Sequence, residues 1–73
     1  MDLRPTDDLV RIAAAGGGFR LEVGLRPIDD LVRIAAAARN HHARLVFASV
    51  GLMSTDDLVR IAAAGDGAVV FEE

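Results

Sequence analysis

One nine-residue stretch, DDLVRIAAA, occurs three times without a change, at residues 7–15, 29–37 and 56–64. The repeats begin 22 and 27 residues apart, a spacing typical of proteins that stack one supersecondary unit per repeat. Because identical stretches favour the same local structure, the chain is constrained to three similar units lying side by side. We expect one domain over residues 1–73, with units at about 3–24, 25–51 and 52–73.

Each repeat has the pattern of an amphipathic helix. Leu9, Ile12 and Ala13 fall at spacings of i, i+3 and i+4, which places them on one apolar stripe. Arg11 follows Asp7 by four residues, the favourable order for an ion pair within one helix, and the same pair recurs in the other repeats. The repeats are therefore expected to form three helices of about three turns each.

Signals at the ends of the repeats agree with these helices. Pro5 and Pro27 precede two of them, where a first helical turn tolerates proline, and Ser54 is a capping residue before the third. Gly16 and Gly65 follow the first and third alanine runs, where glycine commonly ends a helix.

Between the helices the apolar period changes to two. Phe19, Leu21 and Val23 alternate with charged residues, which is typical of a half-buried strand. Two further apolar runs rich in valine and phenylalanine follow the second and third helices. The strands are expected at residues 19–23, 44–50 and 68–71.

The alternating order predicts an α/β fold, a three-stranded parallel sheet with right-handed crossovers and helices on one face. Parallel sheets are usually covered on both faces, so the second face and the two sheet edges call for a partner. We expect that partner to be another chain of the same kind, forming a dimer by sheet packing, edge pairing or helix exchange. The side chains expected at this interface are Leu45, Phe47, Val69 and Phe71, or their alternates on the same strands.

The composition excludes several classes of site. The chain has no cysteine and no lysine, which excludes disulfides, thiolate sites and Schiff-base chemistry. A net charge of −3 does not favour nucleic acid as a partner. The sequence lacks a long apolar run and the features of a signal peptide, so we expect a soluble protein without a targeting segment, cytoplasmic or of unknown compartment, and without a cofactor.

Two sets of residues could hold a metal. Asp8, Asp30 and Asp57 lie at the helix starts, along the carboxyl edge of the predicted sheet, and carboxylates suit a hard cation. His41 and His42 share one loop and could bind a transition metal between chains. Helix capping, ion pairing and a solvated loop explain the same residues without a metal. A metal- or small-ligand-binding module is therefore the second hypothesis.

No enzyme activity is expected, because Ser49 and Ser54 have no histidine predicted at their end of the sheet. The leading hypothesis is a non-enzymatic, self-associating repeat protein with a structural role. The identity of the repeats indicates either a recent duplication or an engineered scaffold, and the sequence leaves both origins open.

Residues 3–18, with the pattern Leu-x-Pro-x-Asp-Asp-Leu-Val-Arg-Ile-Ala-Ala-Ala-Gly-Gly-Gly, resemble the opening of a TAL-effector repeat. The resemblance implies DNA bases read by the residues after each helix, here 15–16, 37–38 and 64–65. The chain departs from that family because strands replace its second helix, its repeats are shorter and it is acidic. We therefore do not assign the chain to the family, and a nucleic-acid-binding repeat is the third hypothesis.

Overall fold

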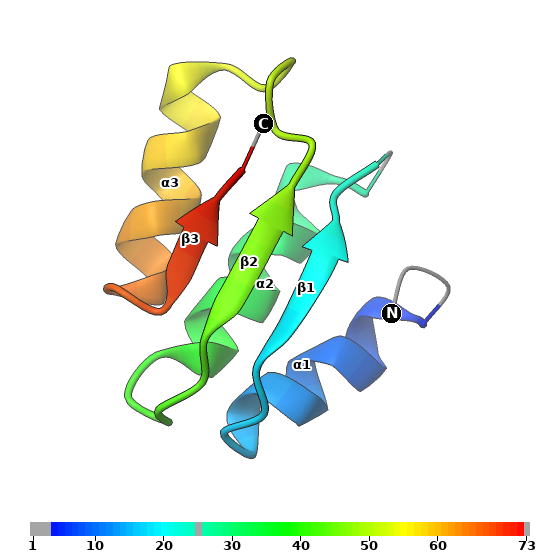
Figure 1. Ribbon diagram of the computed structural model, residues 1–73, viewed down its shortest axis with the longest axis vertical. Helices are drawn as coiled ribbons and strands as arrows, with labels where there is room; N and C mark the ends of the chain where they lie inside the picture. The colour runs from blue at the N-terminus through cyan, green and yellow to red at the C-terminus, as the bar shows by residue number, and fades with distance from the viewer. Residues whose placement is uncertain (1–3, 25, 73) are drawn as a thin grey trace.

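Helices and strands alternate along the chain, as the sequence predicts (Figure 1). The structure is a computed structural model that describes residues 4–24 and 26–72. The elements are α1 (Thr6–Ala14), β1 (Phe19–Glu22), α2 (Ile28–Ala38), β2 (Leu45–Ala48), α3 (Thr55–Gly65) and β3 (Val69–Phe71). None of the helices in the described ranges is long and apolar enough to cross a membrane.

The strands form one parallel sheet in the order β1-β2-β3. The register places Phe19 opposite Leu45, and Leu45 opposite Val69. All three helices lie behind the sheet in Figure 1, and the face toward the viewer carries no helix. The predicted fold class and the one-sided arrangement of the helices are therefore confirmed.

The core lies between the sheet and the helix layer. Its largest fully buried side chains come from all three helices and from β1 and β2, namely Leu9, Leu21, Leu31, Ile34, Leu45, Phe47 and Ile61. The rings of Phe47 and Phe71 lie with their centroids 6.5 Å apart and are tilted by 54°. Such a tilted pair is a favourable aromatic geometry and joins β2 to β3 inside the core.

The helix starts use two different caps. The Ser54 side chain accepts a hydrogen bond from the backbone N–H of Asp57 at 3.2 Å, as its capping role predicts. Pro5 and Pro27 occupy the corresponding positions before α1 and α2 and make no side-chain cap. Among the three helix starts of the described residues, that of α3 therefore has a side-chain cap and those of α1 and α2 do not.

The helix ends also differ. Gly16 has a φ of +91° and ends α1, as predicted, and a Cβ on it would lie 2.8 Å from the carbonyl oxygen of His41. Gly65 instead remains the last residue of α3, and Asp66 takes the left-handed conformation with a φ of 49°. Gly65 is needed for another reason, because a Cβ there would lie 2.8 Å from the side chain of Val69.

Candidate functional site

The charged residues of the repeats connect neighbouring helices. Arg33 Nη2 lies 2.9 Å from Asp7 Oδ1, and Arg60 Nη2 lies 3.3 Å from Asp29 Oδ1. The predicted pairing of Asp7 with Arg11 within one helix is therefore wrong. The helices lie side by side in one orientation, so Arg33 and Arg60 each reach the aspartate of the preceding repeat.

A second polar cluster joins the starts of α1 and α2. Arg26 donates to Thr6 Oγ1 at 3.1 Å and to the carbonyl oxygen of Arg4 at 2.7 Å. Thr6 Oγ1 in turn donates to Asp30 Oδ2 at 3.1 Å. The α1–α2 junction therefore joins Thr6 and Asp7 on one side to Arg26, Asp30 and Arg33 on the other. We call these contacts the α1–α2 polar set.

The outer side of α3 exposes residues that the other repeats cover. Leu58 and Ala62 are more exposed than their counterparts in α1 and α2, which are buried, and Val59 is 58% exposed where its counterparts are partly buried. Because the repeated stretches are identical, this difference in exposure arises from the lack of a further helix beside α3 in the described residues and not from the residue type. We call this surface, formed by Thr55, Asp56, Leu58, Val59 and Ala62, the α3 flank.

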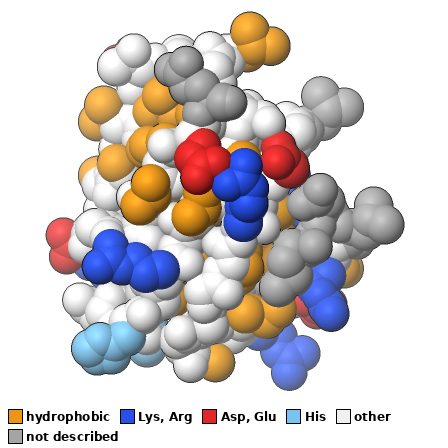
Figure 2. All heavy atoms as spheres, in the orientation of Figure 1, with side chains coloured by type: hydrophobic (Ala, Val, Ile, Leu, Met, Phe, Trp, Pro, Cys, Tyr) orange, Lys and Arg blue, Asp and Glu red, His pale blue; other side chains and the backbone are white. Residues whose placement is uncertain are grey.

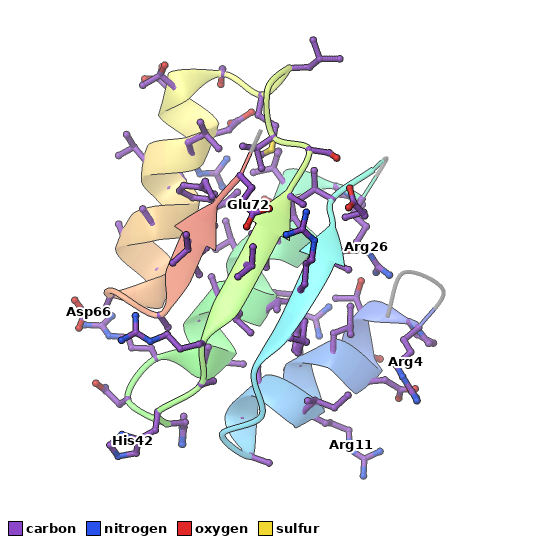
Figure 3. The ribbon with its side chains drawn as sticks, in the orientation of Figure 1. Arg4, Arg11, Arg26, His42, Asp66 and Glu72 are labelled. Atoms are coloured by element: carbon purple, nitrogen blue, oxygen red, sulfur yellow. The ribbon has the colours of Figure 1, made fainter. Side chains whose placement is uncertain are left out.

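The outer side of α1 shows the complementary change. Ile12 is partly exposed, whereas its counterparts Ile34 and Ile61 are fully buried. A hollow of about 420 Å³ lies along this side, which we call the α1 flank, lined by Arg4, Asp8, Arg11, Ile12 and Ala15. Figure 3 shows Arg4 and Arg11 projecting from α1 on the side away from α2.

The open face of the sheet is amphipathic. Arg20 on β1 pairs with Glu72 and lies 3.9 Å from Glu22, and Ser49 donates a hydrogen bond to Glu22. Figure 2 shows basic and acidic side chains together on this face, with hydrophobic groups beside them. Val70, 47% exposed, belongs to the apolar part. Arg20, Glu22 and Glu72 of this face are therefore already paired within the chain.

The side chains chosen from the sequence for the interface lie on the other face. Leu45 and Phe47 are 0% exposed and belong to the core, and Val69 and Phe71 are partly buried against it. Strand alternation explains the correction, since these residues share register with the inward-facing side chains of β1. The open face therefore carries their alternates, with Val46 opposite Val70.

The three aspartates proposed for a hard cation lie on different helices. Asp30 accepts a hydrogen bond from Thr6, Asp57 donates its backbone N–H to Ser54, and Asp8 lines the hollow of the α1 flank. Within residues 4–24 and 26–72, no group of three histidine, cysteine, aspartate or glutamate residues could hold a metal ion. The contacts of Asp30 and Asp57 are those of helix starts.

The histidine loop borders a second hollow. His41 and His42 are exposed, and His42 lines a polar space of about 310 Å³ together with Arg44 and Asp66. Arg39 Nε lies 3.7 Å from Asp66 Oδ2 at the same end of the sheet. Figure 3 places His42 and Asp66 at this end, away from the helix starts.

Comparison with protein-family models, curated proteins and solved structures finds no match. The functional argument therefore depends on the geometry of the chain itself. The sequence reading did not identify Arg4, Arg11, Thr55 and Asp56 as a group. The identity of the repeats was the signal available, because these four residues correspond to residues that meet at the α1–α2 junction.

Proposed function

We propose that the chain is a non-enzymatic, self-associating α/β repeat protein with a structural role. The observation that carries the proposal is the incomplete cover of the sheet. In the described residues, β1 and β3 each pair on one side only, and the face opposite the helices carries Val46 and Val70. A parallel sheet is normally covered on both faces, and unpaired edges are templates for strand addition.

The size of the chain supports the same proposal. A domain of 73 residues without cysteine has no disulfide or thiolate metal site to add to its core. Association is a common remaining source of stability in small domains. Identical repeats suit such a structural role whether they arose by duplication or by design.

Thermal unfolding at several protein concentrations tests this proposal. Association stabilises the folded chains by mass action, so Tm rises with protein concentration. For two associating chains of this size we expect a rise of roughly 3–6 °C for each tenfold increase in concentration. Circular dichroism at 222 nm measures Tm at protein concentrations from about 5 to 500 μM. This range includes the Kd values of chains that associate with ordinary affinity. A Tm independent of concentration would refute self-association.

A second candidate function is binding of a small polar ligand in the hollow beside His42. Its support is the convergence of His42, Arg44 and Asp66 from two loops on one space. A rise in Tm with inorganic phosphate or Zn²⁺, absent in His42→Ala and reversed by a chelator for the metal, is the expected result. An unchanged Tm with both probes at millimolar concentration would exclude this function.

A further inference from the structure

The two outer flanks carry residues equivalent to the two sides of the α1–α2 polar set. On the α2 side of that junction stand Arg26, Asp30 and Arg33, and their counterparts in the first repeat are Arg4, Asp8 and Arg11, all on the α1 flank. On the α1 side stand Thr6 and Asp7, and their counterparts in the third repeat are Thr55 and Asp56, both on the α3 flank.

We propose that the α3 flank of one chain docks against the α1 flank of a second chain, head to tail. Asp56 would then meet Arg11 of the second chain as Asp7 meets Arg33 within one chain. Thr55 would contact Arg4 and Asp8 of the second chain as Thr6 contacts Arg26 and Asp30. The proposal rests on the proposed self-association and names the surfaces that carry it.

The outer repeats match the α1–α2 junction and not the α2–α3 junction. At α2–α3 the threonine is replaced by Ile28 and the arginine by Met53, and both residues pack partly buried against the core. Thr55 and Arg4 keep the polar pair at the two outer ends. The halves that remain exposed are therefore the halves that fit each other, which indicates complementarity between the two flanks.

The apolar groups of the two flanks are complementary as well. In the inner junctions, the residues corresponding to Ile12 are fully buried, and so are the alanines of α1 and α2 that correspond to Ala62. Docking would cover Ile12 on one chain together with Val59 and Ala62 on the other. The contact would therefore bury exposed apolar surface while it completes the polar set.

The unpaired backbone groups at the two free edges of the sheet are compatible with each other. On β1, Phe19 and Val23 donate their N–H groups to β2, so the N–H of Arg20 points to the free edge. At the other side, Glu72 donates its N–H to β2, so the backbone groups of Phe71 point to the free edge of β3. The β3 edge of one chain can therefore add to the β1 edge of the next, in parallel, without changing which side chains face the helices.

The contact is heterologous, since a different surface of each chain takes part. Such a contact does not close at two chains, and we expect a growing series of chains in place of the dimer expected from the sequence. Continued register places Glu72 beside Glu22 of the next chain, and Arg20 of that chain lies next to both. This like-charge contact is exposed, so its effect on affinity is small.

Charge reversal at the two flanks tests the proposal. In Asp56→Arg every junction brings two arginines together, and in Arg11→Asp every junction brings two aspartates together. We expect each variant to weaken association roughly tenfold in Kd at about 50 mM salt. The double variant Asp56→Arg with Arg11→Asp, and an equimolar mixture of the single variants, restore opposite charges at the junctions. Both should recover association to within about threefold of the parent.

Asp29→Arg is the matched control, because it makes the same change at the same repeat position inside the chain. Sedimentation velocity gives Kd for each protein, and circular dichroism confirms that each variant is folded. A parent that is monomeric throughout would refute the proposed function and this inference together. A parent that associates while the reversals have no effect, or are not rescued by the double variant and the mixture, would overturn the inference and leave self-association standing.

Discussion

The same leucine occurs at one position in three repeats, and its replacement by alanine is predicted to cost different amounts of stability. Leu31 is 1% exposed between its two neighbours, whereas Leu58 on the α3 flank is partly exposed. Replacing a buried leucine by alanine costs about 2–5 kcal/mol, the larger part of it where a cavity remains. A domain of 73 residues has a free energy of unfolding of roughly 4–11 kcal/mol. Leu31→Ala should therefore leave the chain marginally stable.

Leu58→Ala should lower the free energy of unfolding by less than Leu31→Ala does, the difference being at least about 1 kcal/mol. The reason is that Leu58 buries less apolar surface in the folded chain. Leu9→Ala should resemble Leu31→Ala because Leu9 is equally buried. Urea unfolding followed by circular dichroism at 222 nm measures the three values, at low protein concentration so that single chains are compared. A constant m-value confirms that the folded state is unchanged.

The concentration dependence of this comparison adds a second check. If the α3 flank is covered by another chain, Leu58→Ala becomes more damaging as the protein concentration rises, and the gap to Leu31→Ala narrows. Equal costs at low concentration would refute the reasoning, because they would mean that Leu58 is already enclosed within the single chain.

Three further predictions concern the fold. Gly16→Ala should destabilise the chain by at least about 1 kcal/mol more than Gly67→Ala. Both residues have a positive φ, +91° and +92°, but of the two only Gly16 is placed where a Cβ would meet backbone. Thermal unfolding of the two variants measures the difference in stability. Ser54→Ala should cost about 1 kcal/mol by removing the cap of α3, and an unchanged urea midpoint would contradict the cap. Phe47→Asp should abolish folding, because a buried, unpaired carboxylate costs several kcal/mol, so a native far-UV spectrum would contradict the placement of Phe47 in the core.

Much of the fold could be predicted because the two apolar periods are distinct. The spacing of Leu9, Ile12 and Ala13 can be satisfied only by a helix, and the alternation of Phe19 and Leu21 only by a strand. Since helices and strands alternate, parallel pairing with helices on one face follows from short connections. The glycine at position 16 also ended its helix as expected, since no side chain fits there.

The errors arose where the answer depends on a neighbouring element. The second strand is apolar on both sides, so its own letters do not show whether Phe47 or Val46 faces the helices. The register with β1 decides this, because Leu21 lies opposite Phe47. The prediction that Asp7 pairs with Arg11 was wrong for a similar reason, since spacing along one helix does not reveal an arginine on the next helix.

The candidate site could be found only by comparing repeats in the folded chain. Val59 and Val32 stand at the same position of identical stretches, and only the first is largely exposed. The sequence shows that the letters are the same, but the missing neighbour becomes visible only when the helices are placed side by side. Arg11 and Asp56 have functional interest for that reason and not for their residue types.

The molar mass in solution tests the central claim most directly. Light scattering behind a sizing column, with refractive-index detection because the chain has no tryptophan or tyrosine, measures it over a range of concentrations. The account predicts a mass that rises with concentration through successive multiples of 7.7 kDa. A constant mass of 7.7 kDa at every concentration would contradict self-association and the head-to-tail contact together.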